Sequence, residues 1–129
     1  MSNPSKRKGT DAEVKLLAWL KANGHKDAVR NPPAGAKDVG DLCCSVLTSP
    51  GDGVYDPDDA MTWWEPCVIE VKSWKDVAAA MRQGIAELEV EKQNAGTGHG
   101  VLVLRRRGVT DPGEWYAVRR VCDDPELGS

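Results

Sequence analysis

The sequence has no apolar run long enough to cross a membrane, and its first residues are polar. We therefore expect neither a transmembrane helix nor a signal peptide, and we predict a cytoplasmic protein. It also contains no Phe, and only 5% of its 129 residues are aromatic. A hydrophobic content of 40% and a charged content of 29% are typical of a soluble globular protein, at a length that suits one domain.

The sequence has four cysteines, at positions 43, 44, 67 and 122. None of them forms a Cys-x-x-Cys pair, and two are adjacent, which suits neither a zinc knuckle nor a disulfide framework. The two histidines, His25 and His99, do not complete a zinc site. We therefore expect reduced, buried thiols.

Charge of one sign does not dominate, because the net charge is only −3. This argues against a protein that coats nucleic acid without specificity. Basic residues nevertheless cluster in three short runs, at 6–8, 105–107 and 119–120. The sequence leaves open whether these runs form a phosphate-binding face or are scattered, solvated charges.

The most informative segment is 67–73, Cys-Val-Ile-Glu-Val-Lys-Ser. In a strand, alternate side chains point to opposite faces, so Ile69 and Val71 share one face while Glu70 and Lys72 share the other. Burying such charges is costly unless they are paired or bound to a metal ion. A Glu-x-Lys pair suits a site in which the carboxylate holds a divalent cation and the ammonium steadies a water or phosphate oxygen. The alternative is an ordinary ion pair on a strand.

The remaining patterns predict an α/β fold, with a single mixed β-sheet flanked by two helices in the order α-β-β-β-α-β and a last strand after it. The first helix is expected from the capping box of Thr10 and Glu13 to Asn23, and the second from about Asp76 to Gly96. The expected strands are 28–30, 39–47, 67–73, 101–104 and 115–121, and the expected loops include 31–35 and 48–61. Residues 1–8 are predicted to be a flexible basic arm, 9–122 a single domain and 123–129 an acidic tail.

Three acids are candidates for one site. Asp41 lies near the start of the expected strand 39–47, so its carboxylate comes close to that of Glu70 if this strand pairs with 67–73. Asp38 is a weaker competitor, nearer the loop. Glu13 follows the apolar stripe of the first helix, either as the capping-box acid alone or as a carboxylate at the edge of the buried face. Carboxylates brought close repel each other, and Mg²⁺ is the natural cation to relieve this.

These residues resemble the signature of PD-(D/E)XK nucleases, namely Asp41 followed by Glu70-Val71-Lys72. Lys8-Gly9-Thr10-x-x-Glu13, Val29-Arg30 and Glu70-Val71-Lys72-Ser73 are more narrowly similar to archaeal-type Holliday junction resolvases and their phage relatives. The resemblance covers residues 8–105. Gly40 stands where the signature has proline, the loop serine of such resolvases has no clear equivalent, and the insertion at 48–66 is long.

The resemblance implies a Mg²⁺-dependent endonuclease, with Mn²⁺ as a substitute, that cleaves branched DNA as a homodimer. Asp41 and Glu70 would coordinate the metal with help from the Val71 carbonyl, and Glu13 would support the metal or its water. Lys72 would orient the attacking water. The residues implied to contact DNA are Lys6, Arg7, Lys8 and Arg30.

Two other functions remain open. The same fold could act on linear duplex or single-stranded DNA, as an exonuclease, restriction or repair enzyme, or it could be a catalytically silent DNA-binding module. The paired Trp63 and Trp64 could stack against DNA, although a core or subunit-contact patch is the more frequent role of such residues.

Overall fold

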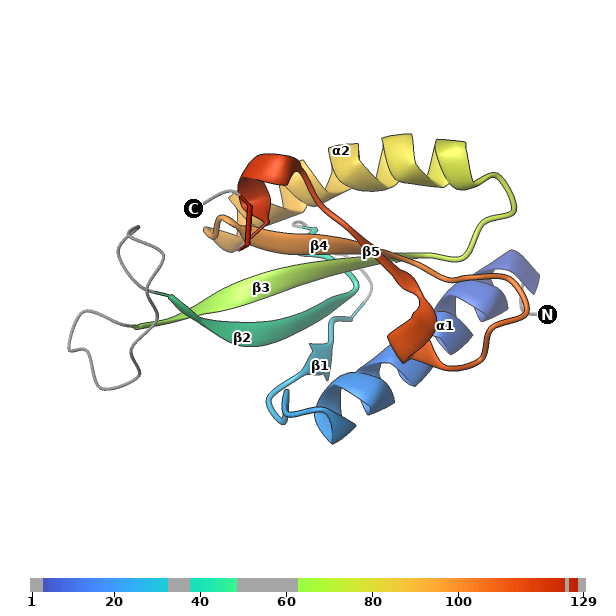
Figure 1. Ribbon diagram of the computed structural model, residues 1–129, viewed down its shortest axis with the longest axis horizontal. Helices are drawn as coiled ribbons and strands as arrows, with labels where there is room; N and C mark the ends of the chain where they lie inside the picture. Colours follow the sequence, from blue (N-terminus) through green and yellow to red (C-terminus); the bar gives the residue numbers. More distant parts are fainter. Residues whose placement is uncertain (1–3, 33–37, 49–62, 125, 128–129) are drawn as a thin grey trace.

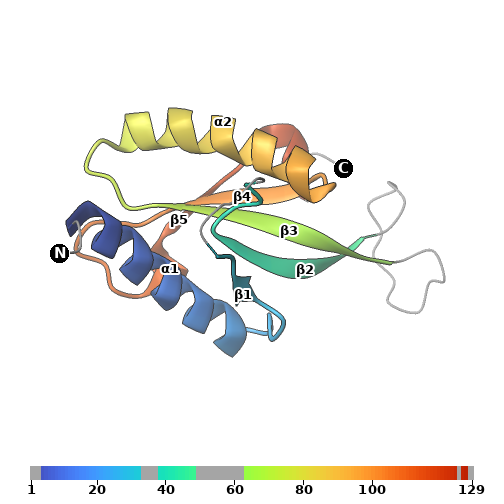
Figure 2. The same cartoon turned by 180° about the vertical axis from the view of Figure 1, so that it is seen from behind.

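The computed structural model describes residues 4–32, 38–48, 63–124 and 126–127, with side chains from residue 9 onward. The chain forms one five-stranded sheet in the order β1-β2-β3-β4-β5, with α1 against one face and α2 against the other (Figures 1 and 2). The elements are α1 (Pro4–Ala22), β1 (Val29–Arg30), β2 (Leu42–Thr48), β3 (Trp63–Lys72), α2 (Val77–Ala95), β4 (His99–Leu104), η1 (Pro112–Glu114), β5 (Tyr116–Val118) and η2 (Val121–Asp123).

The sheet is mixed. β1, β2 and β3 are antiparallel neighbours, β3 and β4 run parallel, and β5 is antiparallel to β4. The parallel pair requires a crossover, and α2 supplies it. The predicted α/β class, the single mixed sheet and the pairing of the second with the third strand are therefore confirmed.

The alternation along β3 divides the molecule into two apolar cores. Ile69 and Val71 pack with Leu42 on the α1 side, whereas Val68 packs with Leu102 on the α2 side. Glu70 lies on the same face as Val68, because it is two residues further along the strand. The predicted division of β3 into an apolar face and a Glu-x-Lys face is therefore correct, and the charged face is the one that α2 covers.

The second helix has clear ends. Asp76 caps its N-terminus by accepting a hydrogen bond from the Ala79 amide at 3.0 Å, and Gly96 ends it with a φ of 71°. The buried face of this helix is not purely apolar. Ala80, Gly84 and Leu88 are buried, but Val77 and Met81 are exposed, and Glu91 and Lys92 are buried in the last turns.

The first helix begins earlier than predicted. α1 starts at Pro4, so residues 4–8 belong to the helix and not to a flexible arm. Proline suits a first helical position, and the Lys and Arg that follow are good helix formers. Thr10 therefore lies inside the helix, and the capping-box interpretation of Thr10 and Glu13 is wrong.

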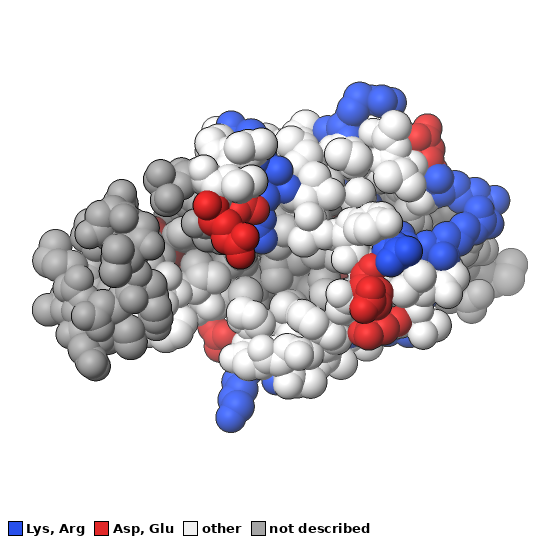
Figure 3. All heavy atoms as spheres, viewed as in Figure 1, with Lys and Arg blue, Asp and Glu red and all other residues white. Residues whose placement is uncertain are grey.

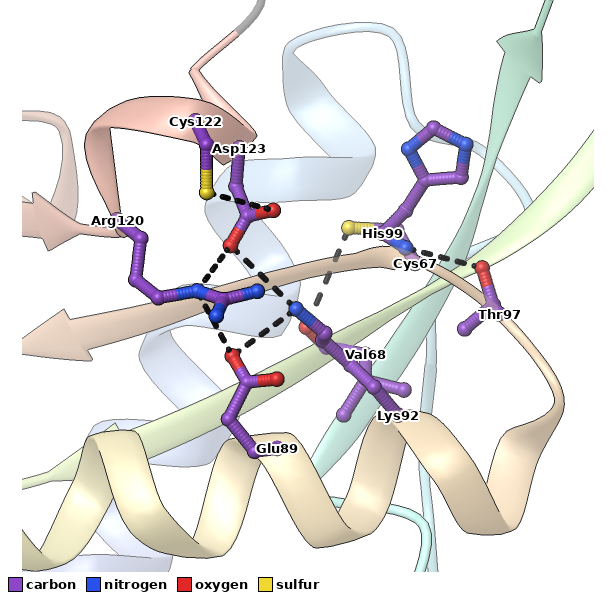
Figure 4. A network of polar contacts seen from close by, with 9 residues as sticks. All are labelled: Cys67, Val68, Glu89, Lys92, Thr97, His99, Arg120, Cys122 and Asp123. Carbon is purple, nitrogen blue, oxygen red and sulfur yellow. Dashed lines mark hydrogen bonds and ion pairs between the residues drawn. The ribbon is translucent and has the colours of Figure 1, made fainter. Parts of the chain in front are cut away.

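The C-terminal segment also differs from the prediction. The last strand spans only Tyr116–Val118, and the next turn, η2, is attached to α2 by charge. In Figure 4 the carboxylate of Asp123 accepts from Lys92 Nζ at 3.5 Å and from Arg120 Nε at 3.0 Å, and Glu89 contacts the same two side chains. Asp123 thus belongs to a docked segment instead of an acidic tail, and it neutralises Lys92, which is only 5% exposed.

The remaining predictions concern two loops, the paired tryptophans, the cysteines and membrane-spanning helices. The loops predicted at 31–35 and 48–61 lie largely outside the described residues. Trp63 and Trp64 are 45% and 68% exposed, so they do not belong to either core. All four cysteines are free, but only Cys44 is buried and Cys122 is exposed. Within the described part of the chain, no helix is long and apolar enough to span a membrane.

Leu102 connects α2 to the sheet and is fully buried. A Cβ atom on Gly84 would lie 2.6 Å from the Leu102 side chain, so the helix and strand approach as closely as glycine permits. We expect Leu102→Ala to lower the free energy of unfolding by about 2–5 kcal/mol, measured by chemical denaturation. Leu127→Ala, at a leucine that is 73% exposed, should change it by less than about 0.5 kcal/mol. Equal effects of the two substitutions would contradict the placement of Leu102 in the core.

Candidate functional site

Asp41 is held in place by the backbone of β3. Its amide donates to the Ile69 carbonyl at 3.0 Å, and its Oδ2 accepts from the Val71 amide at 2.8 Å. Asp41 directly precedes β2, which begins at Leu42. Its carboxylate therefore adds one more hydrogen bond to β3 beyond those of the β2 backbone. One oxygen of Asp41 is thereby fixed, and the carboxylate is oriented along β3.

Gly40 makes this approach possible. Its φ is 95°, and a Cβ atom at this position would lie 2.6 Å from Val68 Cγ1 and 3.3 Å from the Ile69 carbonyl oxygen. A proline cannot adopt this φ, and other residues would collide with β3. Glycine in the place of the signature proline is therefore a requirement of this backbone.

Glu70 is buried among other carboxyl groups. It is only 4% exposed, and burial, followed by the neighbouring carboxyls of Glu91 and Asp41, raises its pKa far above the ordinary range. The structure thus brings Asp41 and Glu70 together as predicted, on the face of the sheet that α2 covers.

Glu91 is a third member of this group that the sequence analysis did not identify. It projects from α2, is 2% exposed, and its Oε1 has no hydrogen-bond partner among the described residues. Burial is the main cause that raises its pKa, and the charges of Asp38 and Asp41 add to it. Asp38 Oδ1 accepts from the Gly40 amide at 3.0 Å, so this weaker candidate lies at the edge of the group.

Lys72 supplies the positive charge beside these acids. Its Nζ lies 3.8 Å from Glu70 Oε1 and 2.7 Å from Glu87 Oε2. Burial lowers the pKa of Lys72, but the ion pairs with Glu87 and Glu70 outweigh it and the net shift is upward. Gln83 Nε2 donates to the other oxygen of Glu87 at 2.7 Å, so two residues of α2 fix the ammonium next to Glu70.

Glu13 does not join the group. It projects from α1 and forms an ion pair with Arg30, whose Nε donates to Glu13 Oε1 at 2.9 Å. Arg30 Nη2 also reaches Thr10 Oγ1 at 3.4 Å. Burial and the charge of Asp41 raise the pKa of Glu13, against the effect of Arg30, but no hydrogen bond joins Glu13 to Asp41 or Glu70. The structure thus brings Asp41 and Glu70 together with Glu91, whereas Glu13 is paired with Arg30. The catalytic role of Glu13 stays a prediction.

Three further predicted residues lie on α1, namely Lys6, Arg7 and Lys8, and their side chains are outside the described part of the structure. Arg30 is partly exposed, and its Nε is committed to Glu13. The contacts of these four residues with DNA therefore stay predictions. The same is true of the Val71 carbonyl as a metal ligand, since the structure defines Val71 only as the donor to Asp41.

The donor set suits Mg²⁺ better than a transition metal. All the groups are carboxylate oxygens, and the buried Oε1 of Glu91 has no hydrogen-bond partner in the described part of the chain. Among the residues that the structure describes, no group of three or more His, Cys, Asp or Glu side chains is placed so that it could hold a metal ion. Mg²⁺ is usually held by one or two carboxylates together with waters and a phosphate, so Asp41 and Glu70 would be sufficient protein ligands.

Comparison with protein-family models, curated proteins and solved structures finds no match to this chain. Its function therefore has to be inferred from the geometry of the site.

The sequence does contain a signal for Glu87 and Glu91, which were not predicted as site residues. Glu87 and Glu91 continue the spacing of Ala80, Gly84 and Leu88 along the buried face of α2. Acids on an otherwise apolar stripe are the same signal that identified Glu70. They were missed because charged residues in a helix usually face solvent.

Removing the charge of Glu91 should stabilise the protein. Because its pKa is raised by folding, both folded and unfolded states are protonated below about pH 4.5, its ordinary value, and the penalty appears as the pH rises above it. We expect Glu91→Gln to increase the free energy of unfolding at pH 8 by about 1–3 kcal/mol and to have little effect at pH 4. Thermal unfolding without divalent ions, at both pH values, measures this. Glu126→Gln, at an exposed residue, is the control, and a Glu91→Gln protein less stable than wild type at pH 8 would disprove the burial of this charge.

Proposed function

We propose that this chain is a Mg²⁺-dependent deoxyribonuclease that hydrolyses phosphodiester bonds at Asp41, Glu70 and Lys72. The observation that carries the proposal is the burial of Glu70 beside two other carboxyl groups and one ammonium. Charge on such a group opposes folding, and a bound cation would relieve this opposition, which supports a cation site here.

The side chains have separate tasks in this proposal. A bound Mg²⁺ would supply charge neutralisation at the scissile phosphate and a lower pKa for an attacking water. Asp41, oriented by the Val71 amide, and Glu70 would hold the ion, and Glu91 would accept a hydrogen bond from its water shell. Lys72, fixed by Glu87, would donate to the attacking water or to a phosphate oxygen, where its charge opposes the charge that develops.

The substrate is inferred from the resemblance to junction resolvases. Cleavage of a four-way junction needs two symmetric cuts, which a homodimer with two-fold symmetry provides. Branched DNA is therefore the substrate that we propose first, with Arg30 and the basic residues at 6–8 as backbone contacts. There are two alternatives, namely linear or single-stranded DNA as the substrate and DNA binding without cleavage. The following assay separates them.

Cleavage should require both the ion and the acids. With Mg²⁺, the purified protein should cut a labelled four-way junction, and EDTA should stop it. We expect Asp41→Asn and Glu70→Gln to reduce the cleavage rate by at least about 100-fold, because each removes charge at the reacting phosphate, with binding to the junction retained.

The control for this assay is Glu126→Gln, which leaves the site unchanged and should cut like wild type. A linear duplex of the same sequence, cut as fast as the junction, would exclude a junction-specific enzyme while leaving the nuclease. Full cleavage by both Asp41→Asn and Glu70→Gln would refute the proposed chemistry, and a wild-type protein that binds but never cuts would favour the silent module.

Binding of the ion has a readout independent of activity. Mg²⁺ should raise the free energy of unfolding at pH 8, by about 2.7 kcal/mol at a concentration of 100 times its dissociation constant. Glu70→Gln should lose most of this increase. If Mg²⁺ stabilises Glu70→Gln as much as wild type, the ion does not bind between Asp41 and Glu70.

A further inference from the structure

A second site lies at the end of the sheet where β3 and β4 finish. A cavity of about 670 Å³ opens there, bounded by the segments that follow these two strands, by α1 and by the first residue of β5. Its volume is in the range of sites for small ligands. The side chains that matter for its chemistry are Trp74, Lys75, Arg105, Arg106, Arg107 and Tyr116.

The lining is strongly basic, with one acid, Asp11, against four cations. Asp11 is already paired with Arg105, whose Nη1 lies 3.0 Å from Asp11 Oδ2. Lys75 and Arg107 are exposed and form no hydrogen bond or ion pair with any residue that the structure describes. Figure 3 shows Lys and Arg side chains gathered at this end of the molecule, on the right of the view, near the N-terminus of α2. The cavity is therefore suited to an anion.

Two aromatic rings give the cavity a second property. Trp74 is 41% exposed and Tyr116 is 55% exposed. The guanidinium of Arg106 lies 4.9 Å from the centre of the Tyr116 ring, and its Nη1 donates to the Glu114 carbonyl at 3.0 Å. The guanidinium thus lies over the ring and keeps further N–H donors for a ligand. Exposed rings next to guanidinium groups bind a stacked base together with its phosphate, whereas a simple anion needs only the charges.

The cavity adjoins the carboxylate site. Trp74 lines the cavity, and its ring lies 5.0 Å from Lys72 Nζ, which in turn lies 3.8 Å from Glu70. Trp74 therefore connects the cavity to Lys72, one of the residues that we propose to perform hydrolysis.

We propose that this cavity binds one unpaired nucleotide of a DNA strand, with its phosphate on Arg106, Arg107 and Lys75 and its base against Tyr116 or Trp74. The nucleotide is unpaired because a base within a duplex has no free face to stack, so it belongs to a strand end or to a branch point. The identification of the strand as DNA rests on the proposed nuclease function. A free mononucleotide has the same chemistry and is distinguished by the experiment.

The test is a binding measurement in EDTA, so that cleavage plays no part. The probe is a fluorescently labelled single-stranded hexadeoxynucleotide, followed by anisotropy, with unlabelled dAMP and inorganic phosphate as competitors. We expect Tyr116→Ala to weaken binding by about 5-fold or more and Tyr116→Phe to retain it, because stacking needs only the ring. Arg107→Ala should also weaken binding and reduce the slope of log Kd against log salt concentration by about 0.7.

The matched control is Arg82→Ala, which removes one exposed charge of α2 outside the cavity and should change Kd by less than about 2-fold. If Tyr116→Ala does not fold, Lys75→Ala and Arg107→Ala decide the matter, since both side chains are exposed and without partners among the described residues. Wild-type affinity in the cavity variants overturns the proposal. The proposal is also overturned if inorganic phosphate competes as well as dAMP does, or if dAMP binds as tightly as the hexanucleotide.

The two proposals can fail separately. A protein that loses binding in the cavity variants but never cleaves DNA supports the nucleotide site and refutes the nuclease. A protein that cleaves DNA while the cavity variants bind the hexanucleotide normally refutes only the nucleotide site.

Discussion

The central constraint in this molecule is a carboxylate buried beside other carboxylates. Glu70 is part of the longest strand, with Asp41 hydrogen-bonded to the next residue of that strand and Glu91 directed at it from α2. Desolvation and repulsion of these groups oppose folding, so the two apolar cores on either side of the sheet have to outweigh them. The arrangement is rigid because every element that carries an acid is packed against β3 or paired with it.

Much of the fold follows from local patterns in the sequence. The alternation of Val68 with Ile69 predicted a strand with two different faces, and Asp76 and Gly96 predicted the ends of α2. The start of α1 was not predictable in this way, because Thr10 and Glu13 have the form of a capping box although they lie inside a helix. Their partner is instead Arg30, which is distant in the sequence, and only the tertiary structure brings it there.

The residues of the candidate site also fall into two groups, those that the sequence identified and those that only the structure revealed. Asp41, Glu70 and Lys72 could be found because an acid and a Glu-x-Lys pair on adjacent strands stand out from an apolar background. Glu87 and Glu91 follow the spacing of Ala80, Gly84 and Leu88, but a charged residue on a helix usually faces solvent, so this spacing alone is a weaker signal than the Glu-x-Lys pair on a strand. The segment after β4 was recognised as a basic run, but the cavity beside it also depends on Trp74, which follows β3, and on Tyr116, the first residue of β5.

The spacing of the polar residues on α2 has one further consequence. Gln83, Glu87 and Glu91 are four residues apart, so they form a single row along the helix axis. Glu87, which pairs with the Lys72 ammonium, and Glu91, the third acid, therefore lie on the same helix, which packs against Leu102 at Gly84. A small slide or roll of α2 would therefore move Gln83, Glu87 and Glu91 together relative to Asp41 and Glu70, which β3 holds in place.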